Sequence, residues 1–443
     1  MKQLSEMNNQ EFYTYAKTLI PGGSQLLSKR PEGFAPNYWP GYATKAQGCQ
    51  VWDLEGNSYY DVTYNGIGAC LLGYADPDVT KAVVDRVQNG SMSTLNAPEE
   101  VYLAERLCQI HPWAESVRYA RTGGETCAMA VRIARATTGR DVVAFCGYHG
   151  WSDWYIAANV GGKDNLKGQL MPGLFPAGVP DALQETAIPF FYGDIEGFDN
   201  VISQYGDRLA CVIMEPVRSG KPNIDFLKHV RAETKRIGAL MILDEITIGW
   251  RYCFGGSHLK LGVMPDMATF AKALGNGHPM GAVIGTREAM DGANRSFISS
   301  TYWTEAVGPA AALATIDKIE KTKAWEYVAA VGTTVMQDWD KAAERHGIEI
   351  HTHGLPCLAH FDFKENPREM KTLYTILMLK EGFLANNAIY PTLAHTEDIL
   401  AKHRDAMDRV FYKMAEIVKK GGSEAVLEAI DNPLAEKDFK RLI

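Results

Sequence analysis

Short apolar runs alternate with stretches of helical spacing through the middle of the chain. Four runs have the length of buried strands, and the segments between them place apolar residues at the spacing of an amphipathic helix. The strands are expected at Ser116–Ala120, Asp141–Phe145, Leu209–Met214 and Ala239–Leu243, and helices at Thr126–Thr137 and Asp225–Ile237. This alternation predicts the α/β class, with a mostly parallel central sheet covered by helices on both faces.

The two ends of the chain have a different pattern. A hairpin that turns at Glu55-Gly56-Asn57 is expected near the start, after a helix over residues 11–20. Strand-like alternation over Ile348–Phe363 and a long helix from Thr396 to Lys420 are expected near the end. We therefore predict a large domain over residues 76–325 and a smaller α+β domain built from residues 1–75 and 326–443.

Length and composition are those of a globular protein with more than one domain. The chain has 443 residues, 46% of them hydrophobic and 22% charged, and a net charge of −8. An acidic chain without a Lys/Arg-rich run is not expected to bind nucleic acid or a membrane surface.

The sequence also bears on location. The polar start, Met1–Gln10, lacks the apolar centre of a signal peptide, and no apolar run is long enough to span a membrane. Eight single cysteines without a Cys-x-x-Cys pair indicate reduced thiols, and hence a cytoplasmic protein.

The clearest chemical signal is an acid and a lysine near neighbouring strand ends. Asp244 and Glu245 follow five apolar residues directly, and Lys272 follows the next apolar run, Met267–Phe270. Parallel sheets place their chemistry at the carboxyl ends of the strands. Pyridoxal phosphate requires a lysine for its Schiff base and a carboxylate at its pyridine nitrogen, so this pair suits that cofactor. Taken alone, the acid is more often a helix cap and the lysine a solvated loop residue.

Three further motifs fit such a site and are weak singly. The turn Thr122-Gly123-Gly124-Glu125 between a strand and a helix offers backbone N–H groups to a phosphate. Tyr148 could stack on a planar ring, although packing is the commoner role of an aromatic residue there. Glu215, at the end of another strand, could order the site or simply face solvent.

Metal binding is not expected. His351 and His353 alternate on one strand, but no further ligand lies near them in the sequence, so a pair of hydrogen-bonded histidines is the simpler interpretation.

Taken together, the motifs resemble the class III pyridoxal-phosphate aminotransferases, and most closely the glutamate-1-semialdehyde aminomutase subgroup. The resemblance extends from Gly22-Gly23 to Asp398, with the motifs in the family's order. It rests on Thr122-Gly123-Gly124-Glu125, Tyr148-His149-Gly150, Glu215-Pro216-Val217, the segment Asp244–Arg251, Lys272 with Gly275-Asn276-Gly277, and Ser300-Thr301. It implies a fold-type I, pyridoxal-phosphate-dependent enzyme that acts on a small-molecule amino donor and acceptor.

The resemblance also implies roles for individual residues. Lys272 would form the Schiff base and then carry the proton, while Asp244 would hold the pyridine nitrogen. Further cofactor contacts are implied for Ile246 and Tyr148 on the two ring faces, for Gly123 and Gly124 at the phosphate, for Glu215, and for Thr301, which in the family reaches the cofactor of the neighbouring subunit. The last contact implies a homodimer with active sites at its interface. Gly124 stands where the family commonly has Ser or Thr.

Two departures bear on the reaction. Ser24–Arg30 differs from the aminomutase pattern, and Asn386–Thr392 shortens the C-terminal gate and lacks its glutamate. Ping-pong transamination with a small aldehyde or keto acceptor is therefore favoured over intramolecular aminomutase activity. A racemase and a non-catalytic binding relative are more distant alternatives. Arg30, Arg251 and Trp303 are candidate substrate contacts, and either arginine could instead form a structural ion pair.

Overall fold

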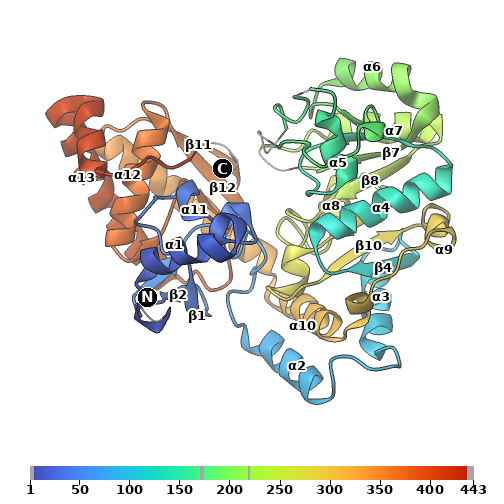
Figure 1. Cartoon of the computed structure of the whole chain (residues 1–443), viewed down its shortest axis with the longest axis horizontal. Coiled ribbons are helices and arrows are strands. Elements are labelled where there is room, and N and C mark those ends of the chain that lie inside the picture. Colours follow the sequence, from blue (N-terminus) through green and yellow to red (C-terminus); the bar gives the residue numbers. More distant parts are fainter. Residues whose placement is uncertain (1–3, 163, 170–173, 218–219, 437–443) are drawn as a thin grey trace. The chain divides into compact units, whose positions relative to one another are not determined.

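The computed structural model describes residues 4–162, 164–169, 174–217 and 220–436. The first three residues of the polar start, and residues 163 and 170–173 of the Gly/Pro-rich stretch, lie outside this set. The chain divides into two compact units, Met1–Asp76 with Glu326–Ile443 and Pro77–Trp325 (Figure 1). Within the described residues, no helix is long and apolar enough to cross a membrane.

The larger unit, Pro77–Trp325, alternates strands and helices in the order that the sequence predicts. Its strands are β4 (Ser116–Ala120), β5 (Val142–Cys146), β6 (Ala187–Pro189), β7 (Leu209–Met214), β8 (Leu240–Asp244), β9 (Met267–Phe270) and β10 (Gly281–Gly285). Its helices are α2 (Pro77–Gln88), α3 (Pro98–Ile110), α4 (Gly123–Thr138), α5 (Asp153–Ile156), α6 (Ile195–Tyr205), α7 (Ile224–Ile237), α8 (Ser257–Leu261), α9 (Gly292–Arg295) and α10 (Val307–Thr322).

These strands form a seven-stranded sheet among the described residues, in the order β4-β10-β9-β8-β7-β5-β6. The pairs β5–β6, β5–β7, β7–β8 and β8–β9 are parallel, whereas β10 runs antiparallel to both of its neighbours. The prediction of a mostly parallel sheet is confirmed. The carboxyl ends of β5, β7, β8 and β9 therefore meet at one edge.

Both faces of this sheet are buried, which explains the unbroken apolar runs of its strands. Val143 and Phe145 of β5 pack in a cluster with α4 and α5. Val142 and Ala144 of the same strand point the other way, into a cluster with α6 and α7. Because successive strand residues point into two apolar layers, neither face of the strand requires polar residues. The strand sequences therefore show no alternation of apolar and polar positions.

The smaller unit contains two sheets and a layer of long helices. Its strands are β1 (Ala43–Gln47), β2 (Gln50–Asp53), β3 (Ser58–Asp61), β11 (Ile350–Leu355), β12 (Leu358–Phe363), β13 (Phe383–Leu384) and β14 (Ala388–Ile389), and its helices are α1 (Asn9–Leu19), α11 (Ala324–His346), which begins at the boundary, α12 (Pro367–Lys380) and α13 (Glu397–Ile430). In the described part, the sheets have the orders β1-β2-β3-β13 and β11-β12-β14. The pairing of β3 with β13 joins the N-terminal and C-terminal segments within one sheet.

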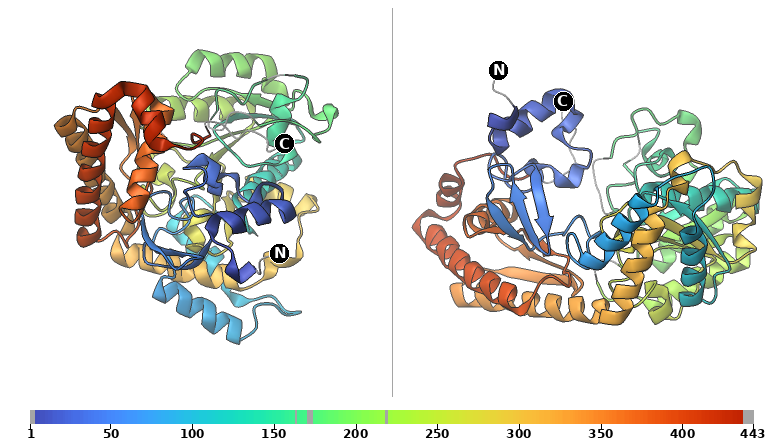
Figure 2. Two further views of the ribbon diagram at one scale, coloured as in Figure 1. Left: turned by 60° about the vertical axis from the view of Figure 1, so that its left-hand side comes forward. Right: turned by 90° about the horizontal axis from the view of Figure 1, so that it is seen from below.

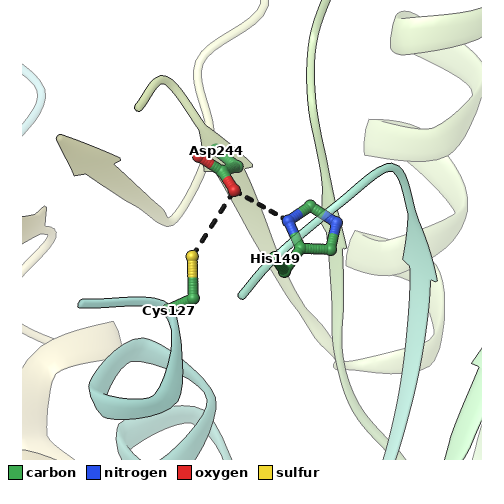
Figure 3. Close-up of side chains that lie close together, drawn as sticks. All are labelled: Cys127, His149 and Asp244. Atoms are coloured by element: carbon green, nitrogen blue, oxygen red, sulfur yellow. Dashed lines mark hydrogen bonds and ion pairs between the residues drawn. The ribbon is translucent and has the colours of Figure 1, made fainter. Parts of the chain in front are cut away.

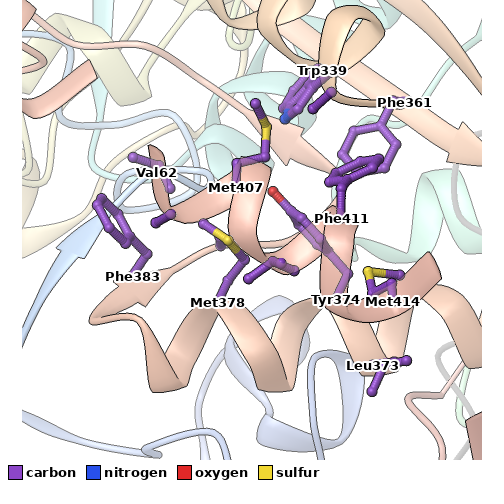
Figure 4. Close-up of a cluster of buried hydrophobic side chains, with 14 of the residues drawn as sticks. Val62, Trp339, Phe361, Leu373, Tyr374, Met378, Phe383, Met407, Phe411 and Met414 are labelled. Atoms are coloured by element: carbon purple, nitrogen blue, oxygen red, sulfur yellow. The ribbon is translucent and has the colours of Figure 1, made fainter. Parts of the chain in front are cut away.

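Helices α12 and α13 run side by side (Figures 1 and 2). The core beneath them contains Trp339 of α11, Phe361 of β12, Tyr374 of α12 and Phe411 of α13 (Figure 4). Because these side chains come from four separate elements, the three helices are held to one face of β11–β12.

Two predicted helix boundaries were wrong. Helix α4 begins at Gly123 rather than Thr126, because Thr122 and Glu125 form a reciprocal capping box that brings both glycines into the first turn. The last helix continues past Lys420 to Ile430, with non-helical backbone at Gly421 and Gly422.

Candidate active site

Polar groups gather at the sheet edge where β5, β8 and β9 end. Asp244 is the last residue of β8 and pairs in register with Thr269 of β9. Lys272 follows that strand after one residue, Ala271, and His149 follows β5. Asp244 and His149 are buried. The sheet topology thus brings the predicted acid and lysine to one edge, with a histidine beside the acid (Figure 3).

The Asp244 carboxylate accepts three hydrogen bonds. Oδ2 accepts from His149 Nδ1 at 2.7 Å and from the Cys127 thiol at 3.4 Å (Figure 3). Oδ1 accepts from the Ile246 N–H at 3.0 Å. Burial alone would raise the pKa of Asp244. The hydrogen bond and charge of His149, with the two other donors, outweigh this effect and hold the pKa below its usual range. The group is therefore a buried carboxylate anion.

His149 faces an acceptor oxygen on both sides of its ring. Nδ1 lies 2.7 Å from Asp244 Oδ2, and Nε2 lies 3.1 Å from the carbonyl oxygen of Cys146. His149 is thus placed between two acceptor oxygens and holds Asp244 from the side of β5.

Cys127 reaches Asp244 from the second turn of α4. Burial raises the pKa of this thiol well above its ordinary value, and the neighbouring carboxylate raises it further. Among the described residues, Cys127, His149 and Asp244 are the one group of three possible metal ligands whose ligand atoms all lie within 4.8 Å of each other. A thiol that stays protonated is a hydrogen-bond donor rather than a metal ligand, so we interpret the group as a support for the carboxylate.

The adjacent acid, Glu245, has a structural role. Its two oxygens accept from the N–H and hydroxyl of Ser257 and from the N–H and Nδ1 of His258, at 2.8–3.0 Å. His258 Nε2 in turn accepts from the Trp113 indole at 3.0 Å. A carboxylate has about four lone-pair positions. Among the described residues, Glu245 has four donors, three of them on Oε1, whereas Asp244 has three donors and can accept one more.

The first turn of α4 lies close to this carboxylate. A Cβ on Gly123 would lie 3.2 Å from two carbons of Ile246, and a Cβ on Gly124 would lie 3.3 Å from the Trp151 indole. Helix N-termini carry backbone N–H groups without intrahelical acceptors and favour anions. The two glycines therefore leave the narrow approach to these N–H groups clear.

Tyr148 and Glu215 lie on the β5–β7 side of the edge. The Tyr148 N–H points to Glu215 Oε2 at 3.5 Å, and the Tyr148 ring is half-buried against Tyr155. Gly147 has a φ of 111°, and a Cβ there would lie 2.6 Å from Glu215 Oε2. Glycine at this position allows the buried Glu215 to pass beneath the loop and order it.

Lys272 has a strained backbone. Its φ is 47°, in the left-handed region that non-glycine residues rarely adopt, and its Nζ donates to Thr247 Oγ1 at 2.9 Å. Strain of this kind costs of order 1–3 kcal/mol and is concentrated at functional sites. The lysine amine is consequently oriented toward the segment that follows β8.

Thr301 and Trp303 lie in a 3₁₀ helix, Thr301–Thr304, that precedes α10. Arg121, after β4, donates to the Trp303 carbonyl at 3.0 Å and to Glu305 Oε1 at 2.9 Å. Glu305 also accepts from the first N–H groups of α10. This half-buried ion pair fixes the segment that carries Thr301, which is itself exposed.

The two candidate arginines are both buried. In the smaller unit, Arg30 Nε lies 3.7 Å from Glu32 Oε2, and Arg30 Nη2 lies 3.4 Å from Glu436 Oε2. The charge of Arg30 is therefore balanced within the chain. Arg251, in the larger unit, has no exposed surface. The ion-pair interpretation suits Arg30, and neither guanidinium faces solvent.

Sequence reasoning did not select four residues that the structure adds to this edge: His149, Cys127, Thr247 and Arg121. His149 directly follows Tyr148, and Cys127 lies four residues after Gly123, on the same side of the helix. These short separations from Tyr148 and Gly123 are the sequence signal that could have identified His149 and Cys127. Arg121 and Glu305 are 184 residues apart in the chain, so no local sequence pattern predicts their contact.

The sheet, the acid and lysine at its edge and the glycine-rich helix start define a fold-type I transferase that depends on pyridoxal phosphate. The chain belongs to the aminotransferase class-III family, whose model matches residues 35–414. It is therefore an enzyme of the pyridoxal-phosphate-dependent aminotransferase class, with an amino donor and an acceptor as substrates.

Relatives and solved structures agree with this assignment. The chain is 28% identical to the 3-aminobutyryl-CoA aminotransferase of Cloacimonas acidaminovorans, over 90% of this chain and 95% of the relative. It is 29% identical to the glutamate-1-semialdehyde 2,1-aminomutase of Polynucleobacter asymbioticus, over 91% and 98%. The PLP internal aldimine form of the Sphingopyxis sp. MTA144 FumI protein has a TM-score of 0.85 at 23% identity, covering 94% of this chain and 99% of that chain.

Proposed function

We propose that the chain transfers an amino group from a donor to a small aldehyde or keto acceptor by a ping-pong mechanism, with Lys272 and Asp244 as its central residues. The observation that carries the proposal is the Asp244 carboxylate: buried, anionic, held by three donors and able to accept a fourth. That remaining position suits the protonated nitrogen of a pyridine ring. Glu245 already has four donors from Ser257 and His258 and is held away from this role.

The residues around Asp244 fit pyridoxal phosphate. The cofactor supplies an electron-withdrawing ring and carries the amino group between half-reactions. Ile246 and Tyr148 would bind the two faces of the ring, and Glu215 would order the loop that carries Tyr148. The N–H groups of Gly123 and Gly124 would bind the phosphate, aided by the positive end of the α4 dipole.

Lys272 would attach the cofactor through Nζ and then move a proton to and from the substrate carbon. The amine has to be neutral when it accepts that proton. Thr247 Oγ1, which accepts from Nζ at 2.9 Å, orients the amine without adding a negative charge that would keep it protonated. This contact is consistent with a catalytic base rather than a solvated surface lysine.

The segment that replaces the aminomutase gate supports transamination. Asn386, Ile389 and Thr392 are buried within the smaller unit, where β14 pairs with β12 and Asn386 Oδ1 accepts from the Ala388 N–H. A segment fixed in this way is a poor gate, and an aminomutase has to retain its intermediate while the amine moves. Aminomutase activity remains the second candidate, because a relative of that name aligns over almost its whole length.

We also propose a homodimer in the cytoplasm, with Thr301 contributing to the partner's site. Thr301 is exposed, and so are the neighbouring apolar side chains Phe297 (85%) and Tyr302 (69%). Exposed aromatic residues beside a polar contact residue are typical of a protein–protein interface. All eight cysteines, each a described residue, are free thiols, as a reducing compartment requires.

The test is an absorbance spectrum of the purified protein before and after addition of single amino donors, including glutamate, alanine and a diamino acid. We expect one donor to convert the bound cofactor and to release its keto product. Lys272→Ala should lower the rate of this conversion by a factor of roughly 10³ or more. Lys260→Ala, at a lysine that lies over the Tyr252 ring, is the matched control and should convert normally. Product formation from a single substrate, without a keto product, would instead indicate an aminomutase.

A further inference from the structure

The capping box at the start of α4 leaves two backbone donors unused. The Thr122 N–H donates to Glu125 Oε2, and the Glu125 N–H donates to Thr122 Oγ1. The N–H groups of Gly123 and Gly124 come next to them and have no acceptor among the described residues. Two adjacent N–H groups are therefore left for an anion, at the place where the proposed function puts the cofactor phosphate.

A third donor, on a different segment, lies beside these two. The two atoms nearest to a Cβ built on Gly124 are Cδ1 and Nε1 of Trp151, both at 3.3 Å. They form the edge of the indole that carries its N–H group, and an indole nitrogen can only donate. This N–H has no partner in the part of the chain that the structure describes. The donor edge of Trp151 thus lies against the first turn of the helix.

The side-chain donor and the backbone donors are close enough to share one acceptor. A Cβ lies about 2.5 Å from the nitrogen of its own residue, so Trp151 Nε1 and the Gly124 nitrogen are at most about 5.8 Å apart. An oxygen accepts from a nitrogen over about 2.9 Å, so one phosphate oxygen can bridge nitrogens at that separation. A phosphate at the helix start can therefore bind both without a change in the backbone.

The loop that carries Trp151 is fixed just before it. His149 Nδ1 lies 2.7 Å from Asp244 Oδ2, which ties the loop to the end of β8. Gly150 has a φ of 103°, and a Cβ there would lie 2.8 Å from Gly124 Cα. Glycine at both positions lets the loop pack directly on the helix, so the approach of the indole is built into the backbone.

Core packing does not account for this position. All nine tryptophans lie in the described part of the chain, and Trp151, at 73%, is the only exposed one. A single exposed apolar side chain needs no explanation by itself. An indole whose donor edge lies at the start of a helix with two unused N–H groups indicates a ligand that accepts hydrogen bonds.

We infer that the Trp151 indole N–H binds the phosphate of the cofactor and supplies the side-chain donor that Gly124 cannot provide. The inference rests on the proposed function, because it uses the same phosphate site. Trp151 is a binding residue here and does not contact the reacting atoms. A side chain at Gly124 would press on the indole, so a donor on the helix and the donor on the loop are alternatives for one position.

The experiment is titration of the cofactor-free, full-length protein with pyridoxal phosphate and, separately, with pyridoxal, which lacks the phosphate. Trp151→Phe keeps an aromatic ring and removes the donor. It should weaken pyridoxal phosphate binding roughly tenfold and leave pyridoxal binding within about twofold of the parent chain. Trp52→Phe is the matched control, at a half-buried tryptophan that packs under Lys45 in the smaller unit. It should bind both ligands as the parent chain does.

A second set of variants separates a lost donor from a disturbed loop. In a Trp151→Ala background, Gly124→Ser places a hydroxyl on the helix and should recover most of the lost affinity for pyridoxal phosphate. Gly124→Ala in the same background should recover none. In the parent chain, where the indole lies 3.3 Å from the new Cβ, Gly124→Ser should give no gain. Circular dichroism shows whether each variant folds.

The indole resonances in a proton–nitrogen NMR spectrum give a readout that does not depend on catalysis. Inorganic phosphate should move one of them downfield, and that resonance should be absent from Trp151→Phe. Unchanged pyridoxal phosphate affinity in Trp151→Phe, or an equal loss of pyridoxal affinity, would overturn the inference and leave the proposed function intact. A parent chain that does not bind pyridoxal phosphate would instead refute the proposed function.

Discussion

Replacing Cys127 by alanine tests whether the donors around Asp244 tune the cofactor site. The thiol is fully buried and donates to Asp244 Oδ2 at 3.4 Å, so the alanine variant removes one of three donors and opens no route to water. A hydrogen bond to a charged group contributes about 1.5–3 kcal/mol, and a thiol is a weak donor, so we expect about 1 kcal/mol. The pKa of Asp244 should rise, because one of the donors that lower it is lost.

The measurable consequence is weaker cofactor binding, because an aspartate that holds its proton more readily is a poorer partner for the pyridine nitrogen. A loss of about 1 kcal/mol corresponds to a roughly fivefold higher dissociation constant of pyridoxal phosphate, measured by titration of cofactor-free protein. Cys127→Ser restores a donor of similar size and should bind within about twofold of the parent chain. Cys211→Ala removes an equally buried thiol from β7 and controls for the cavity. Equal affinity in the alanine and serine variants would refute the reasoning.

Three further predictions follow from buried or crowded positions. Burial, and then the neighbouring His258, lower the pKa of His111 from 6.5 to about 4, so the unfolded chain binds this proton first as the pH falls. As the pH falls from 6.5 to about 4, the free energy of unfolding of the larger unit should fall by about 3 kcal/mol. The His111→Asn variant, measured by denaturant unfolding, should not show this part of the pH dependence. Gly123→Ala pushes against Ile246 and should weaken pyridoxal phosphate binding roughly tenfold in the same titration; unchanged affinity would place the phosphate elsewhere. Gly332→Ala drives a Cβ into the Pro356 carbonyl oxygen and should destabilise the smaller unit by about 3 kcal/mol in a urea melt, whereas a neutral result would contradict the close approach of α11 to that loop.

The large sheet could be predicted from the sequence because its strands are unusually apolar. Runs such as Leu209–Met214 are buried on both faces and are flanked by helices of clear periodicity, so local pattern and global fold agree. Strand β10, Gly281–Gly285, was not predicted. It runs antiparallel to its neighbours, and its apolar centre of three residues between two glycines is too short to give a clear strand signal.

The candidate site could be predicted less completely, for two physical reasons. Asp244 and Lys272 stand at strand ends, which periodicity locates. The partners of Asp244 come from α4 and from the loop after β5, 117 and 95 residues away in the chain, so no local pattern links them. The same holds for His353 and His360, which meet through the pairing of β11 with β12.

The two adjacent acids show what the fold adds to such a motif. In the sequence, Asp244 and Glu245 differ only in length and position. Successive residues at a strand end point in opposite directions, and here one direction leads to Cys127 and His149 and the other to Ser257 and His258. The second set places four donors on its carboxylate, which makes Glu245 part of the scaffold. The first set holds its carboxylate as an anion and leaves it one lone pair short of saturation, and an acid that is stabilised but not saturated is what a cationic ligand requires. The choice between the two acids therefore depends on the number of donors around each, which only the folded chain determines.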